Sequence, residues 1–193
     1  MLTARWQAVL DSITASQDKK QTLRARLGRT ASLIVPRLYL SDATMVRNEN
    51  ELARLGITHV KSVLEHAPII ADIIPQEHRL HISLADSPVS DILSHLTTTT
   101  EFITRALAKN KQNKVLGVSR SATVVIAYLI ASSGMCVSEA LQHTQAKREI
   151  VYPNYGFRRQ LETYAEDFVG KRTREESTRF AMIGEYTDEK TPG

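Results

Sequence analysis

The sequence predicts one α/β domain in which a central mixed or parallel sheet is flanked by helices. Short segments of strand character alternate with helical segments through most of the chain, and the last segments are all helical. The longest apolar run, residues 122–131, directly follows a short β-branched segment, as a buried helix follows a strand in such folds. At 193 residues and 42% hydrophobic content, the chain can bury one core of ordinary size.

Four short strands are predicted from β-branched or alternating segments that end in turn residues. Pro36 is tolerated near the start of the first because that strand is predicted to lie at the sheet edge. The third alternates strictly, which places Leu80, Ile82 and Leu84 on one face. The predicted strands span residues 34–40, 57–64, 78–84 and 115–116.

Five helices are predicted from apolar residues at helical spacing. Gly56 ends the first, Ser90 or Asp91 caps the second, and Asn154 caps the last. The third is apolar on all sides, so it is predicted to lie in the core. The predicted helices span residues 48–55, 92–108, 122–131, 137–148 and 157–168.

The domain, residues 33–168, is predicted to lie between a basic helical arm, residues 1–32, and a charged, disordered tail, residues 169–193. Residues 1–30 carry six basic and two acidic residues, so the whole formal charge of +4 lies there. The arm either contacts an acidic surface or packs its own apolar stripe on the domain. The basic pI therefore gives no reason to expect a DNA-binding fold.

The cellular location is predicted from what the chain contains. Cys136 is its single cysteine, so no intrachain disulfide can form and a reducing compartment, the cytoplasm or nucleus, is expected. The chain has neither the apolar core of a signal peptide nor an apolar run long enough for a transmembrane segment. The six histidines show no metal-ligand spacing, and neither a metal nor a cofactor is predicted.

Two loops qualify as ligand sites because ligands of open α/β sheets bind where strands lead into helices. These are residues 85–90 and residues 117–121. The second loop ends in Ser119, Arg120 and Ser121 at the start of the apolar helix. A helix N-terminus offers free backbone N–H groups, and an arginine beside it can bind two phosphate oxygens, so this turn is suited to phosphate.

Several motifs, in this order and almost throughout with the expected spacing, resemble dual-specificity protein phosphatases of the cysteine-dependent tyrosine phosphatase superfamily. The resemblance covers residues 33–168. It implies the fold of that family and a phosphorylated protein, on tyrosine, serine or threonine, as the partner. The motifs lie at residues 34–40, 56–60, 84–88, 117–123, 147–148 and 153–161.

The resemblance also implies roles for individual residues. In the family, a cysteine thiolate six positions before an arginine attacks phosphorus, and that arginine clamps the phosphoryl group. Arg120 matches the clamp, Asp86 the general acid that protonates the leaving group, and Ser121 the hydroxyl that helps the thiolate leave. Gly117, Val118 and Ser119 match the phosphate-binding loop together with Arg120.

The sequence departs from the family at the nucleophile. The sixth residue before Arg120 is Lys114, and five residues, the cysteine among them, are missing between Leu116 and Gly117. With them the chain is expected to lose the end of its central strand and about half of the loop amides. Cys136 lies beyond an intervening helix and cannot replace the nucleophile.

No significant phosphatase activity is therefore predicted for this chain. The hydroxyl of Ser119 has no adjacent histidine base in sequence reach, and an unassisted alkoxide is inaccessible near neutral pH.

Three functional hypotheses follow. The chain is a pseudophosphatase that binds a phosphorylated partner or competes with active relatives, or it is an interaction scaffold without an anion site. Alternatively, it is an active phosphatase whose true sequence contains the five missing residues. The abrupt in-frame gap, with well-matched residues on both sides, favours a recent or artefactual loss over long drift.

Overall fold

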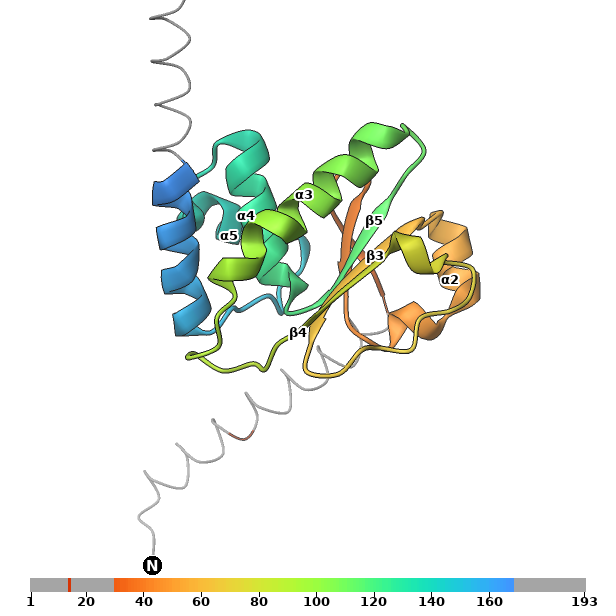
Figure 1. Ribbon diagram of the computed structural model, residues 1–193, viewed down its shortest axis with the longest axis horizontal. Coiled ribbons are helices and arrows are strands. Elements are labelled where there is room, and N and C mark those ends of the chain that lie inside the picture. The colour runs from red at the N-terminus through yellow and green to blue at the C-terminus, as the bar shows by residue number, and fades with distance from the viewer. Residues whose placement is uncertain (1–13, 15–29, 169–193) are drawn as a thin grey trace, which may run out of the picture.

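The computed structural model describes residue 14 and residues 30–168. The predicted tail, and all of the predicted arm except Thr14 and residues 30–32, lie outside the described residues. A five-stranded sheet in the order β1-β2-β5-β3-β4 forms the centre of the domain. Figure 1 shows α3, α4 and α5 on one side of this sheet and α2 on the other. The predicted α/β architecture is confirmed.

The sheet is mixed. Strands β2, β5, β3 and β4 run parallel, and β1 pairs antiparallel with β2. The prediction of one strand over residues 34–40 is wrong, because the chain turns at Pro36 and Arg37, where Arg37 has a φ of 70°. The strands are β1 (Ser32–Val35), β2 (Leu38–Ser41), β3 (His59–Leu64), β4 (Arg79–Ser83) and β5 (Val115–Ser119).

All five predicted helices are confirmed to within a few residues. Gly56, with a φ of 68°, ends α2, and the Asp91 carboxylate accepts from the Ser94 N–H at the start of α3. No helix in the described residues is long and apolar enough to cross a membrane. The helices are α2 (Glu49–Leu55), α3 (Leu93–Lys109), α4 (Ser121–Ser133), α5 (Val137–Lys147) and the C-terminal helix (155–168), with short 3-10 turns η1 (Met45–Arg47) and η2 (Gln76–His78).

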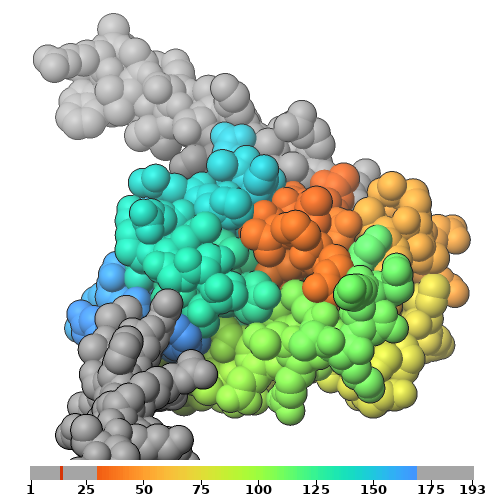
Figure 2. Space-filling model, turned by 90° about the horizontal axis from the view of Figure 1, so that it is seen from above, coloured from red at the N-terminus to blue at the C-terminus, as the bar shows by residue number. Residues whose placement is uncertain are grey.

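The core consists of one apolar cluster on each face of the sheet. Along β5, Val115 packs toward α3 and α4, whereas Leu116 and Val118 pack toward α2. The hairpin of β1 and β2 closes one edge. Figure 2 shows this orange hairpin beside the green end of α3, where the Arg37 guanidinium donates to the Leu107 carbonyl at 2.9 Å. Both faces of β5 are therefore covered, and only its carboxyl end is free to form a site.

Candidate functional site

The connection between β5 and α4 is a single residue. Strand β5 continues to Ser119, and only Arg120 separates it from α4. Gly117 and Val118 pair with β2 on one side and β3 on the other, so their backbone groups are used in the sheet. The predicted loop over residues 117–121 is therefore not formed.

The expectation that the central strand loses its end is also wrong. Residues 117–119 complete β5, because a strand between two neighbours must pair its backbone groups on both sides. The turn after the strand is short instead, since Arg120 alone separates β5 from α4. The resemblance to the family places Gly117 and Val118 in the loop, but a motif does not indicate which segment the sheet uses.

The short turn draws α4 against the sheet. A Cβ atom on Gly117 would lie 3.2 Å from Leu40 Cδ1 and 3.2 Å from Ser121 Cβ. Ser119 has a φ of 60°, in the left-handed region that non-glycine residues seldom adopt. Glycine in the strand and a strained residue at its end thus allow the chain to enter the helix directly.

A cavity of about 290 Å³ lies at the carboxyl ends of β2 and β5. Asp86, Ser119 and Arg120 all line it, as the motifs predict, and the Arg120 Nε atom lies 3.7 Å from the Asp86 Oδ2 atom. Ser121 is turned away: its buried hydroxyl donates to the Lys61 carbonyl at 3.0 Å. Asp86 and Arg120, the predicted general acid and phosphate clamp, thus line the same cavity, whereas the Ser121 hydroxyl lies outside it.

Arg120 is the most informative side chain of this cavity. Only 18% of it is exposed, and its Nε and Nη1 atoms are buried with no hydrogen-bond partner in the part of the chain that the structure describes. The Asp86 carboxylate is too distant to accept a hydrogen bond from Nε. Because buried guanidinium donors are costly when unpaired, the cavity is chemically suited to an anionic acceptor.

The loop that carries Asp86 is fastened to the start of the C-terminal helix. The Asn154 Nδ2 atom donates to the Asp86 Oδ1 atom at 3.0 Å, while the Asn154 Oδ1 atom accepts from the Phe157 N–H at 2.9 Å. Asn154 is therefore the predicted helix cap and also a positioning residue for Asp86. The second role joins residues far apart in sequence, so no local pattern indicated it.

Gln160, one turn further along the same helix, makes a second set of hydrogen bonds that hold this loop. Its side-chain oxygen accepts from the Ile92 and Leu93 N–H groups at 2.8 and 2.9 Å, and its amide donates to the Ser90 carbonyl at 2.9 Å. These bonds satisfy backbone groups at the start of α3, directly after the loop of Asp86. The position of that loop is thus set by two helices.

Arg148 also lines the cavity, and the resemblance assigns it no role there. It is almost completely buried, and its Nη1 atom donates to the Thr30 carbonyl at 3.1 Å and lies 3.3 Å from the Ser32 hydroxyl. Burial lowers the pKa of Arg148, and the nearby Asp42 carboxylate opposes that shift. Unlike Arg120, Arg148 already has acceptors.

The described residues that line the cavity include no cysteine and no histidine. Cys136 is exposed at the start of α5, where its sulfur accepts from the Glu139 N–H, and it lies beyond the whole length of α4. Ser119 has no histidine base beside it in this cavity. The described residues of this site are therefore suited to binding an anion, and they include no thiol.

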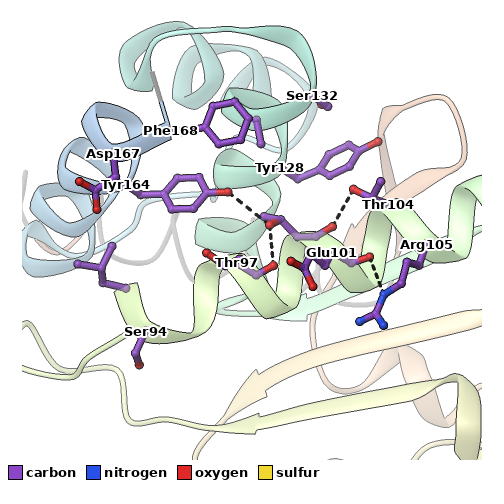
Figure 3. Close-up of a pocket in the computed structure, with 13 residues that line it drawn as sticks. Ser94, Thr97, Glu101, Thr104, Arg105, Tyr128, Ser132, Tyr164, Asp167 and Phe168 are labelled. Carbon is purple, nitrogen blue, oxygen red and sulfur yellow. Dashed lines mark hydrogen bonds between the residues drawn. The ribbon is translucent and has the colours of Figure 1, made fainter. Parts of the chain in front are cut away.

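A larger cavity, about 750 Å³, lies between α3, α4 and the C-terminal helix (Figure 3). None of the predicted site residues lines it. The Thr100 and Thr104 hydroxyls donate to carbonyls of their own helix, and the Tyr164 hydroxyl lies 3.4 Å from the Thr100 hydroxyl. Because none of the predicted site residues lies there, the smaller cavity is the candidate site.

A mixed sheet whose central strand leads through Arg120 into a buried helix, with Asp86 3.7 Å from that arginine, agrees with the resemblance to protein phosphatases. Comparison with known families agrees. The model of the dual specificity phosphatase catalytic domain matches residues 38–167. The chain belongs to the dual-specificity phosphatase family.

Curated relatives have similar sequences over most of this chain. Rat dual specificity protein phosphatase 15 is 34% identical over 81% of this chain and 66% of its own length. Human dual specificity protein phosphatase 26 is 39% identical over 68% of this chain and 65% of its own length. Rat protein phosphatase Slingshot homolog 3 is 34% identical over 85% of this chain, which spans only 29% of that relative.

Solved structures share the fold. The crystal structure of DUSP15 has a TM-score of 0.68 and 29% identity, and the match covers 77% of this chain and 96% of that one. The human tyrosine phosphatase-like serine/threonine/tyrosine-interacting protein has a TM-score of 0.63 and 31% identity, with 73% and 99% covered.

Proposed function

We propose that this protein is a pseudophosphatase that binds a phosphorylated partner protein without hydrolysing the phosphate. The observation that carries the proposal is Arg120, whose buried Nε and Nη1 atoms lack hydrogen-bond partners at the wall of a cavity. A phosphate group that reaches this guanidinium supplies acceptor oxygens that the described residues do not provide. The free N–H groups at the start of α4 add a favourable dipole.

The same cavity limits what happens after binding. Without a thiolate, phosphate transfer loses its covalent two-step route, and removal of a nucleophile alone costs on the order of 10⁶ in turnover in other enzymes. Asp86 supplies an acid for a leaving group but no nucleophile, and its negative charge beside Arg120 weakens anion binding. We therefore expect modest affinity and no turnover.

Two further observations support the proposal, one for the regulatory role and one for the cellular location. The human relative of known structure bears the name of a tyrosine phosphatase-like protein that interacts with serine/threonine/tyrosine, and its chain is covered almost completely. An exposed free thiol at Cys136 suits a reducing compartment. We place the protein in the cytoplasm or nucleus, where it would compete with active phosphatases for their phosphoprotein substrates.

Binding of a phosphotyrosine peptide to the full chain tests the proposal. The wild type is expected to bind the phosphorylated peptide and not its unphosphorylated form, and Arg120→Ala is expected to remove this binding. Arg105→Ala, which changes an exposed arginine on α3 outside the cavity, is the matched control and should bind normally. Equal binding by wild type and Arg120→Ala would favour the scaffold hypothesis, in which no anion site exists.

Hydrolysis of an aryl phosphate tests the absence of turnover. Wild type and Asp86→Ala are expected to give the same background rate, because an acid without a nucleophile contributes little. A wild-type rate well above that of Asp86→Ala would contradict the proposal.

The second candidate is an active phosphatase whose true sequence contains the missing residues. It is favoured by the contact between Asp86 and Arg120 at 3.7 Å, which is retained although this chain has no thiolate to use it. Sequencing of the full-length transcript distinguishes the two candidates directly.

A further inference from the structure

Exposed apolar side chains gather around the candidate site. In the described part of the chain, six large apolar or aromatic side chains are exposed, and three of them lie near the cavity, two in loops and one at the start of the C-terminal helix. Val89, Tyr152 and Tyr155 are 89%, 74% and 67% exposed. Single exposed apolar residues are ordinary, but a group at the rim of a binding cavity marks an interaction surface.

Val89 and Tyr155 line a separate depression of about 330 Å³. Its walls come from the loop after Asp86 and from the first turns of the C-terminal helix. The two walls touch closely, since a Cβ atom on Gly156 would overlap the Pro88 carbonyl. The depression therefore has a fixed shape, and binding there does not first require the loop to become ordered.

This depression lies beside the cavity that Asp86 and Arg120 line, which we call the anion cavity. The hydrogen bond between Asn154 and Asp86 lies between the two. Asp86 and Asn154, which form that bond, each lie within two residues of the depression's lining, at Pro88 and Tyr155. An extended peptide advances about 3.3 Å per residue. A peptide with its phosphorylated residue in the cavity consequently carries a residue one to three positions away over the depression.

The charge of this surface favours an acidic partner. Arg159 is exposed at the edge of the depression, and none of the residues that line the depression is acidic. On the other side of Asn154, the Arg158 guanidinium lies 4.0 Å from the centre of the Tyr152 ring. A carboxylate of the partner therefore meets positive charge on this rim, without a competing negative group in the depression.

We propose that the depression is a second subsite, which receives an apolar side chain of the partner next to the phosphorylated residue, with Arg159 favouring a carboxylate beside it. The proposal rests on the proposed function, because the same phosphoprotein occupies both places. It assigns the partner a sequence preference that the anion cavity alone cannot provide.

Phosphotyrosine peptides of equal length and charge test the proposal against the full chain. The peptides carry leucine or serine at each of the three positions before and after phosphotyrosine, and the dissociation constants are measured by fluorescence anisotropy. At one of these positions leucine is expected to tighten binding by about tenfold, as burial of much of a leucine side chain would. Val89→Ser and Tyr155→Ser are expected to remove this preference while leaving the binding of the serine peptides unchanged.

Ile69→Ser is the matched control, because Ile69 is 68% exposed and lines neither the cavity nor the depression. It should retain the leucine preference, and Arg159→Gln should remove the advantage of a glutamate neighbour over a glutamine. Phosphate-dependent binding with no leucine preference, or a preference that survives in Val89→Ser and Tyr155→Ser, overturns the second subsite alone. Absence of any Arg120-dependent binding overturns the proposed function as well.

Discussion

At the scale of single residues, Lys61 is the side chain least suited to its surroundings. It lies in β3 with no exposed surface, and its Nζ atom has no hydrogen-bond partner within the described residues. Burial lowers the pKa of Lys61 well below its ordinary value, because burial disfavours the charged amine. The cost of burying this group reduces the stability of the fold.

Replacing Lys61 with methionine is therefore expected to stabilise the protein, by about 1 to 3 kcal/mol at neutral pH. Below the ordinary pKa of 10.5 the unfolded chain binds more protons at Lys61 than the folded chain does, so Lys61 destabilises the fold there. The advantage of Lys61→Met should shrink as the pH rises toward 10.5. Urea unfolding of both proteins over this range measures it, and a destabilised or pH-independent variant would show that Lys61 has an acceptor when folded.

His59 gives the fold an acid-sensitive residue. Burial, together with the nearby charges of His78 and Lys109, lowers the pKa of His59 from 6.5 to about 4, and its ring stacks on that of His78 with centroids 4.1 Å apart. Between these two values the unfolded state binds more protons, so stability should fall as the pH drops from about 6.5 to about 4.

His59→Phe keeps an aromatic ring in the stack and removes the titrating group. Its free energy of unfolding is expected to depend less on pH than that of the wild type between about pH 6.5 and 4. Part of the dependence should remain, because burial also lowers the pKa of His81. His66→Asn changes an exposed histidine and should behave like the wild type. Identical pH profiles for His59→Phe and wild type would mean that His59 titrates alike in both states.

At the scale of elements, the junction of β5 and α4 depends on Gly117. A side chain there meets Leu40 Cδ1 and Ser121 Cβ at 3.2 Å, and the Ser121 Cβ atom cannot withdraw without moving the helix. Gly117→Val is therefore expected to destabilise the fold by about 1 to 3 kcal/mol, although valine favours strands elsewhere. Thermal unfolding measures the loss, and a valine variant as stable as the wild type would show that α4 can shift away.

The helices could be predicted from the sequence because the spacing of their apolar residues is local. The positions of Asp86 and Arg120 could also be predicted, for a different reason. Each residue follows a strand, and parallel strands end at the same edge of a sheet. The turn at Arg37 and the continuation of β5 through Ser119 could not be predicted, since each depends on which neighbours complete the sheet. The Asn154–Asp86 bond and the place of Arg148 in the cavity likewise depend on packing between distant segments.

At the scale of the whole molecule, the fold keeps the aspartate and the arginine of the family motifs together, although the turn between β5 and α4 is short. Asp86 and Arg120 come from different parts of the sequence, yet packing holds them 3.7 Å apart, and Asn154 fixes the acid. Only the turn between β5 and α4, which consists of Arg120 alone, is shorter than the family motif implies. If that turn is the sole defect, its restoration should be sufficient for activity.

Insertion of Val-His-Cys and two small residues between Leu116 and Gly117 makes this testable. The first three inserted residues should take the strand positions of residues 117–119, which would place the cysteine at the end of β5 and release Gly117 to Ser119 into a loop before Arg120. The inserted protein is expected to hydrolyse an aryl phosphate, and Asp86→Ala or Arg120→Ala should abolish the activity. The same insertion with serine in place of cysteine is the matched control, because serine at that position has no base to activate it. A folded but inert cysteine insertion would mean that the remaining residues no longer support catalysis, and that binding is what this fold retains.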